Sequence, residues 1–130
     1  MYILDTNTLI YFFKGKGQIA KNLFATYPKD IAIPSIVLYE LEVGIAKSSF
    51  PQKRTKQLQN LTNIINILPF GYDEARIAAA IRTKLEKSGT PIGPYDILIA
   101  AIAVSNRSTL VTHNIKEFNR IKNLDLVDWY

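Results

Sequence analysis

The sequence contains no cysteine and a single histidine, His113. Without cysteine, neither a disulfide framework nor a thiolate metal site can form, so a metal site must use oxygen ligands and at most one imidazole. Long apolar runs are also absent, since the longest, residues 97–104, is too short to span a bilayer. Asp5 lies within the first five residues and no secretory signal pattern follows, so we expect a soluble, cytoplasmic protein without membrane contact.

The bulk composition is that of an ordinary globular protein of 130 residues. A chain of this length can bury about two thirds of its unfolded surface without a disulfide or structural metal. Repeats, low-complexity segments and linkers are absent, so residues 1–130 are expected to form a single domain. The net charge of +5 favours a polyanionic partner only mildly, because solvated basic helix faces explain it equally well.

Short apolar segments alternate with segments of helical character along the chain. Strands are expected at residues 2–5, 31–33, 65–70, 109–112 and 124–129. Helices are expected at residues 9–14, 18–25, 35–47, 52–65, 74–87, 93–105 and 117–121, with Ser35 and Asp73 as N-caps. This order predicts an α/β fold, a three-layer α/β/α sandwich around a mostly parallel, roughly five-stranded sheet.

Three acidic residues lie in apolar surroundings on separate predicted elements. Asp5 ends the first strand, at the edge of the sheet where ligands of open α/β folds bind. Glu40 has apolar helical neighbours and is expected to face inward, whereas Glu42 lies about 200° around the helix and is expected to face solvent. Asp96 lies in the first turn of the most apolar helix.

Structural alternatives exist for these acids. Asp5 could be a turn residue, with Thr6 or Asn7 as the N-cap of a helix. Asp96 could simply complement the helix dipole, an interaction worth about 0.3–1 kcal/mol. A carboxylate on the apolar face around Glu40 still needs a partner, because an unpaired buried charge is costly.

A divalent cation would relieve the repulsion among Asp5, Glu40 and Asp96. Oxygen ligands without thiolates select a hard ion, Mg²⁺ or Mn²⁺. Because Mg²⁺ often completes its shell with substrate phosphate, the predicted chemistry is metal-assisted hydrolysis of a phosphodiester. His113 and Asn114 follow the strand that ends at Thr112, and they share the crevice with Asp5 if that strand lies beside the first.

Four sequence blocks resemble those of PIN-domain nucleases: LDTN at residues 4–7, YELEVG at 39–44, GPYDILIAA at 93–101 and TLVTHNIKEF at 109–118. Their order and the chain length resemble the VapC-type ribonuclease toxins of bacterial toxin–antitoxin pairs. The resemblance covers essentially the whole chain. No block is specific by itself, but all four in this order are strongly specific.

The resemblance places the family's acidic residues at Asp5, Glu40 and Asp96, and it implies that these are catalytic residues that bind the metal. The family's fourth position, often acidic, falls on Asn114, which would lower the formal charge of the site to −3. Thr112 matches a serine or threonine of the family and would orient a water or hold Asp5. Asn114 and Thr112 are therefore supporting residues of the site, and His113 is either a surface residue or a substrate contact.

The resemblance also implies an activity and partners. The activity would be Mg²⁺- or Mn²⁺-dependent endoribonuclease cleavage by metal-activated water, on tRNA or another RNA of the translation machinery. Since water and not a ribose hydroxyl attacks, the products would carry 5′-phosphate and 3′-hydroxyl ends. A VapB-like antitoxin would block the acidic site, often with an inserted Arg or Lys, and homodimers would assemble into larger toxin–antitoxin complexes.

Two surfaces are candidates for contact with these partners. Tyr11, Phe12 and Phe13 cannot all face inward from one short helix, so their exposed part forms either a partner groove or a stray aromatic beside ordinary core packing. The basic residues that could follow an RNA backbone are Lys14, Lys16, Arg82 and Lys84.

Two rival functions remain open. A metal-dependent phosphatase that forms an aspartyl-phosphate would need an acid at position 7, where Asn7 stands. A non-catalytic RNA-binding module would use the basic surface alone, but a polyanion gains nothing from a negatively charged cleft.

Overall fold

The computed structural model describes all residues, 1–130, and contains one sheet of five parallel strands. The strand order is β3-β2-β1-β4-β5. The strands are short: β1 (Tyr2–Leu4), β2 (Ile31–Pro34), β3 (Asn66–Leu68), β4 (Thr109–Val111) and β5 (Asp125–Val127). Because β1 and β4 are neighbours and lie on either side of the point where the order reverses, their carboxyl ends form the switch-point crevice.

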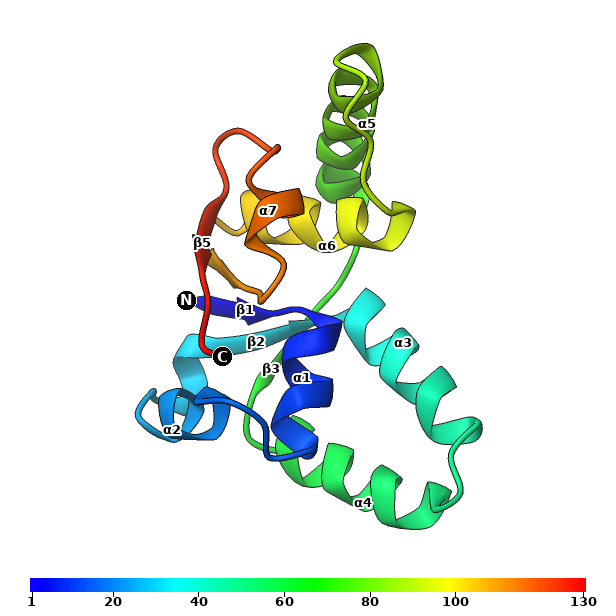
Figure 1. Ribbon diagram of the computed structural model, residues 1–130, viewed down its shortest axis with the longest axis vertical. Helices are drawn as coiled ribbons and strands as arrows, with labels where there is room; N and C mark the ends of the chain where they lie inside the picture. Colours follow the sequence, from blue (N-terminus) through cyan, green and yellow to red (C-terminus); the bar gives the residue numbers. More distant parts are fainter.

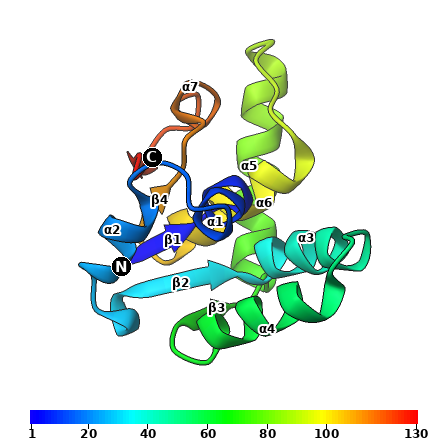
Figure 2. The ribbon, with the colours of Figure 1, turned by 60° about the horizontal axis from the view of Figure 1, so that its bottom comes forward.

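Helices cover both faces of the sheet, which confirms the three-layer α/β/α architecture predicted from the sequence. Figure 1 shows α5, α6 and α7 on one face and α1, α2 and α4 on the other, with α3 continuing from the end of β2. Figure 2 shows β1 leading directly into α1 and β2 directly into α3. The helices are α1 (Thr6–Phe13), α2 (Ile19–Phe24), α3 (Ser35–Ala46), α4 (Pro51–Thr62), α5 (Tyr72–Lys87), α6 (Pro94–Ser105) and α7 (Ile115–Phe118), with a 3₁₀ turn at Pro28–Asp30.

The hydrophobic core is built around the central strands and α6. Ile3 and Leu4 of β1 and Leu110 of β4 are completely buried, as expected of parallel strands covered on both faces. Helix α6 is apolar on nearly all sides, and its Ile99 and Ile102 are also completely buried. None of the helices combines the length and apolar character that a membrane span requires.

The N-caps of three helices differ from those predicted from the sequence. Helix α1 begins at Thr6 and not at residue 9, since the Asp5 carboxylate accepts a hydrogen bond from the Thr8 N–H at 2.9 Å. Ser35 is the first residue of α3 and caps nothing, because Pro34 precedes it as the N-cap. The cap of α5 is Gly71, whose N–H donates to the Glu74 carboxylate at 2.8 Å, so Asp73 lies inside the helix.

The last residues of the chain are fixed against the start of the fold. Trp129 is buried and its ring packs on Tyr2, with 5.1 Å between ring centroids. The Tyr130 carbonyl accepts a hydrogen bond from the Gln18 N–H at 2.6 Å. The approach is possible because Gly17 lies directly beneath it: a Cβ at that position would be 2.5 Å from the Tyr130 carbonyl oxygen.

Replacing Gly17 by alanine should therefore destabilise the protein more than the same change at Gly15. Both glycines have left-handed backbone conformations, with φ of +63° and +68°, so both variants lose about 1 kcal/mol from backbone strain. Only Gly17→Ala adds a clash, because nothing lies within 4 Å of a Cβ at Gly15. Chemical denaturation should give a lower midpoint for Gly17→Ala than for Gly15→Ala, and equal midpoints would contradict the close contact.

Candidate functional site

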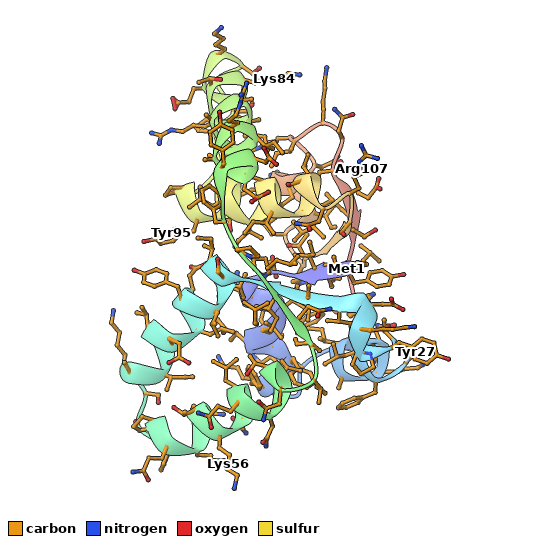
Figure 3. The ribbon with its side chains drawn as sticks, turned by 180° about the vertical axis from the view of Figure 1, so that it is seen from behind. Met1, Tyr27, Lys56, Lys84, Tyr95 and Arg107 are labelled. Carbon is orange, nitrogen blue, oxygen red and sulfur yellow. The ribbon has the colours of Figure 1, made fainter.

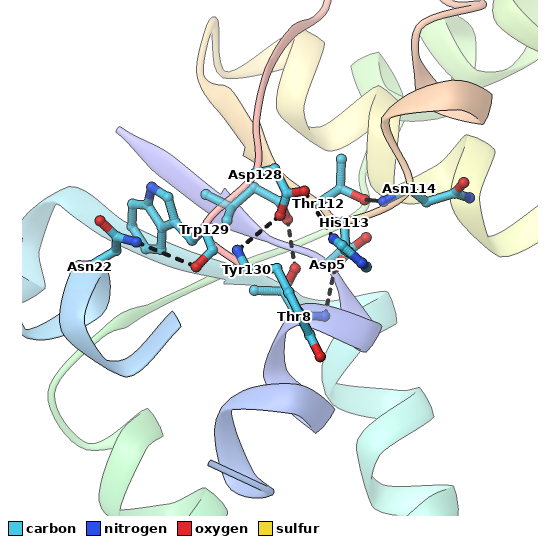
Figure 4. Close-up of polar contacts among 10 residues, drawn as sticks. Asp5, Thr8, Asn22, Thr112, His113, Asn114, Asp128, Trp129 and Tyr130 are labelled. Carbon is cyan, nitrogen blue, oxygen red and sulfur yellow. Dashed lines mark hydrogen bonds and ion pairs between the residues drawn. The ribbon is translucent and has the colours of Figure 1, made fainter. Parts of the chain in front are cut away.

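The carboxyl ends of β1 and β4 bring two predicted site residues together. Leu4 pairs with Val111 across the two parallel strands, so Asp5 and Thr112 leave the sheet side by side. The Asp5 N–H still donates to the Val111 carbonyl at 3.2 Å, which continues the ladder by one step. Figure 4 shows the Asp5 side chain between Thr8 of α1 and Thr112.

Asp5 is almost completely buried, with 4% of its surface exposed. Burial raises the pKa of its carboxyl group above the usual range, and the hydroxyl of Thr112 and the hydroxyl and N–H of Thr8 oppose this shift. The negative charge of Asp128 adds a small upward contribution. The carboxylate is therefore held in one orientation by the first turn of α1 and by β4.

Glu40 reaches the same edge of the sheet from α3. Its carboxylate accepts a hydrogen bond of 2.7 Å from the hydroxyl of Thr6, the residue that follows Asp5. Glu40 is half-buried and lines an open groove, so the predicted inward face is in fact the wall of a cleft. Glu42 is exposed, as its position on the helix predicted.

Asp96 enters the site from the first turn of α6. Burial, together with the negative charges of Asp5, Glu40 and Glu117, raises its pKa to about 6. Its carboxylate accepts no hydrogen bond from a protein donor, in contrast to Asp5 and Glu40. The alternative that Asp96 merely complements the dipole of α6 leaves this proximity of several acids unexplained.

Glu117 is a fourth acid that the sequence reasoning missed. It lies in α7, three residues after Asn114, and the Asn114 side-chain amide donates to its carboxylate at 3.0 Å. Asn114 thus supplies a donor that orients an acid. With Glu117 included, four carboxylates influence the site, one more than the three that the sequence predicts. Glu117 is the one acid in the block TLVTHNIKEF.

Thr112 is completely buried and its hydroxyl has two neighbours. It accepts a hydrogen bond of 3.0 Å from the Asn114 N–H, and it also lowers the pKa of Asp5. Of the two roles considered for Thr112, the contacts therefore favour holding Asp5 and the turn that follows β4.

His113 is part of the anchor for the C-terminus. Its ring nitrogen Nδ1 lies 2.9 Å from the Asp128 carboxylate, and its ring stacks on Tyr130 with 4.3 Å between centroids. Tyr11 packs edge-on against both rings. Figure 4 shows His113, Asp128 and Tyr130 beside Asp5. These contacts link the turn after β4 to the last residue of the chain.

The acids match the chemistry of a hard cation, although they do not surround a single point. All four candidate ligands are carboxylates. The charges of Asp5, Glu40 and Glu117 raise the pKa of Asp96, so the site carries uncompensated negative charge. No three acidic or histidine side chains lie close enough together to hold an ion directly. This spacing suits Mg²⁺, which usually keeps several waters and takes only one or two carboxylates.

An open groove of 260 Å³ leads away from Glu40 between α1, α3 and α4. Apolar side chains such as Phe13, Leu41 and Ile45 line it together with the basic Lys14 and Arg54. The other two aromatics of α1 turn elsewhere: Phe12 packs against Phe13 and Phe24, and Tyr11 against His113 and Tyr130. The groove therefore uses one of the three predicted aromatics.

The basic residues predicted to follow a polyanion lie in different places. Lys14 lines the groove beside Glu40. Arg82 is paired with Glu86 on α5, at 2.9 Å, and Figure 3 shows Lys84 near the far end of the same helix. Lys16 is exposed in the loop after α1. Lys14 is thus the one with a direct structural link to the acids.

Replacing Asp96 by asparagine should raise stability in a pH-dependent way. The folded protein retains the Asp96 proton up to about pH 6, whereas the unfolded chain releases it near the ordinary pKa of 3.8. The charged carboxylate therefore lowers stability above pH 6, and the loss disappears as the pH falls toward 4. Thermal unfolding without divalent cations should give Asp96→Asn a Tm about 2 °C or more above wild type at pH 8. The difference should vanish near pH 4; a gain that is the same at both values would contradict the electrostatic origin.

Comparison with known proteins gives consistent matches along the chain. The family model of the PIN domain matches residues 2–124. A relative from Rickettsia felis, named Ribonuclease VapC2, is 37% identical and covers 99% of this chain and 98% of its own. A relative from Salmonella typhimurium, named tRNA(fMet)-specific endonuclease VapC, is 34% identical and covers 98% and 97%, respectively. The crystal structure of VapBC2 from Rickettsia felis bound to a promoter DNA fragment contains a chain with 38% identity and a TM-score of 0.92, covering 99% and 98%.

Proposed function

Because the chain belongs to the PIN-domain family and is similar along its whole length to VapC ribonucleases, we propose that it is the ribonuclease toxin of a toxin–antitoxin pair and requires a divalent cation. The observation that carries the proposal is the uncompensated cluster formed by Asp5, Glu40, Asp96 and Glu117. A cluster of this kind binds a hard cation, and a bound cation is what allows a phosphodiester to approach four carboxylates.

We assign Asp5 and Asp96 as ligands of Mg²⁺ or Mn²⁺. Glu40 would bind the same ion either directly or through a water molecule. Asp96 is suited to this role because no protein donor satisfies its carboxylate. Asp5 is suited because Thr8 and Thr112 fix it in position. When bound, the cation would neutralise charge on the phosphate and lower the pKa of water.

The chain's own groups then determine the remaining chemistry. The carboxylates of Glu40 and Glu117 face the site as proton acceptors for an attacking water, each held by one hydrogen bond, from Thr6 and from Asn114. The sequence has one histidine, so a mechanism that uses a histidine pair is excluded. Attack by water leaves a 5′-phosphate and a 3′-hydroxyl.

RNA of the translation machinery is the substrate we propose. The relative from Salmonella typhimurium is named for action on tRNA(fMet), and it is 34% identical to this chain. Lys14 and Arg54, which line the groove next to Glu40, are placed to contact the phosphate backbone that continues from the cleavage point.

A VapB-like antitoxin is the partner we propose for the groove between α1, α3 and α4. The matched structure from Rickettsia felis is a VapBC2 complex. The apolar lining around Leu41 fits the side chains of a peptide, and Glu40 at one end can pair with an inserted Arg or Lys. Such a peptide would cover the acids. A homodimer remains a prediction from the family resemblance.

The first experiment is cleavage of a small-RNA pool by the purified protein with Mg²⁺, with Mn²⁺ and with EDTA. Asp5→Asn should abolish cleavage while the fold is retained, because asparagine can still cap α1. Glu40→Gln should reduce cleavage strongly, whereas Glu42→Gln, on the exposed side of the same helix, should leave it unchanged. End-mapping should find 5′-phosphates.

Two results would contradict this assignment. Cleavage that survives both EDTA and Asp5→Asn would show that the acids are not the site. Equal damage from Glu40→Gln and Glu42→Gln would show that the face of α3 is wrongly assigned. As a readout independent of activity, Mg²⁺ should raise the Tm of the wild type and not that of Asp96→Asn.

The antitoxin groove can be tested at Gly44, which lines it and where a Cβ would have no atom within 4 Å. Gly44→Leu should fill the apolar part of the groove and keep the fold, and inhibition is measured relative to the variant's own cleavage without antitoxin. Inhibition of cleavage by the cognate antitoxin should be lost. Ala46→Leu, an exposed change on the same helix outside the groove, is the matched control and should remain fully inhibited. Full inhibition of both variants would exclude the groove.

A further inference from the structure

Two tyrosines adjoin acids of the cluster. Tyr39 immediately precedes Glu40 on α3, and Tyr95 immediately precedes Asp96 on α6. Their rings meet edge to face, with 5.7 Å between centroids and an interplanar angle of 70°. Figure 3 shows Tyr95 at the start of α6, on the side of the molecule where α3 begins. The pair thus bridges two helices that each carry an acid of the site.

Core packing does not account for this pair. Tyr39 is 52% exposed and Tyr95 is 44% exposed, so both rings keep much of their surface in solvent. Other aromatics near the site, such as Tyr11, are half-buried and do contact the core. Two large rings in mutual contact on the surface, from distant parts of the chain, offer an apolar surface with polar hydroxyl tips.

Each ring is also adjacent in sequence to an acid of the site, Tyr39 to Glu40 and Tyr95 to Asp96. A phosphate bound through a cation at Glu40 and Asp96 would therefore have the rings beside it, where the base of an adjoining nucleotide would lie.

We propose that Tyr39 and Tyr95 form a stacking platform for an unpaired nucleobase next to the scissile phosphate. The inference rests on the proposed function and adds two contact residues to it. A base in a duplex is already stacked on both faces, whereas a base in a loop or single strand can turn onto aromatic side chains. Because every base has a π-face, this platform would hold the strand without reading its sequence.

An RNA strand fits the surface better than a protein segment does. The rings lie directly beside the acids where a phosphate must bind, and a peptide seated there gains no phosphate contact. The groove proposed for the antitoxin shares Glu40 and continues along α3 toward Leu41 and Ile45, and neither tyrosine lines it. A second copy of the chain would place its own carboxylates against this cluster, which repulsion disfavours.

The test measures binding of a fluorescein-labelled 12-nucleotide oligo(A) RNA by fluorescence anisotropy, in Mg²⁺, with Asp5→Asn as the non-cleaving background. That substitution removes a negative charge and so does not itself repel the strand. The comparison ligands are a strand of equal length with central abasic sites and a 12-base-pair RNA duplex. The variants tested are Tyr39→Ala, Tyr39→Phe and Tyr95→Ala. The matched control is Tyr72→Ala, which removes a tyrosine of α5 that is 76% exposed.

Loss of either ring should weaken oligo(A) binding about five- to hundredfold, the range measured for one stacked base. Tyr39→Phe should bind like the background, because the ring is retained. Binding of the abasic strand and of the duplex should be the same in all variants, and Tyr72→Ala should leave every Kd unchanged. The same substitutions in the active protein should raise KM more than they lower kcat.

Several outcomes would overturn the platform. These are unchanged oligo(A) binding in Tyr39→Ala and Tyr95→Ala, equal losses for the normal and abasic strands, or Tyr39→Phe as damaging as Tyr39→Ala. A changed oligomeric state or loss of antitoxin binding, with RNA binding intact, would assign the rings to a protein partner instead. If the wild type cuts RNA and these results occur, only the platform fails; if it neither binds nor cuts RNA, the proposed function fails as well.

Discussion

Repulsion among carboxylates at the carboxyl end of β1 is the constraint on which the rest of the site depends. Asp5 is almost fully buried, and Asp96 is close enough to three other acids for their charges to raise its pKa to about 6. Hydrogen bonds from the first turn of α1 and from the Thr112 hydroxyl stabilise the negative charge of Asp5. The carboxylate of Asp96 has no such hydrogen bond. In the proposed function, a bound cation would relieve this imbalance.

The same contacts couple the site to the stability of the fold. Asp5 is both the N-cap of α1 and a member of the acidic cluster, so the helix that fixes it also determines where it points. Thr6, the next residue, holds Glu40 of α3, and the Thr112 hydroxyl accepts from the turn that leads to Glu117. The acids therefore come from four elements, yet hydrogen bonds from protein donors hold three of them in place.

The fold and most of the acids could be predicted from the sequence, because burial patterns and strand ends are local signals. The alternation of short apolar strands with helices specified the parallel sheet, and apolar surroundings identified Asp5, Glu40 and Asp96. Glu117 could not be found this way, since it lies on a helix of four residues between Asn114 and the buried Phe118, without an apolar stretch around it. Helix N-caps were misjudged at Ser35 and Asp73, because the competing caps depend on backbone geometry that residue preferences alone do not determine.

A negatively charged site can act on a polyanion only if attraction and selectivity come from outside the acids. A cation bridging carboxylates and phosphate binds every RNA alike, so it cannot distinguish one strand from another. In the proposed function, the groups at the rim make this distinction. Lys14 and Arg54 would attract the backbone on one side, and the tyrosine pair beside Glu40 and Asp96 would accept only a base that is free to turn. Selection by conformation thus becomes possible on a surface that reads no base edge, because stacking in a duplex already occupies the faces that the rings would contact.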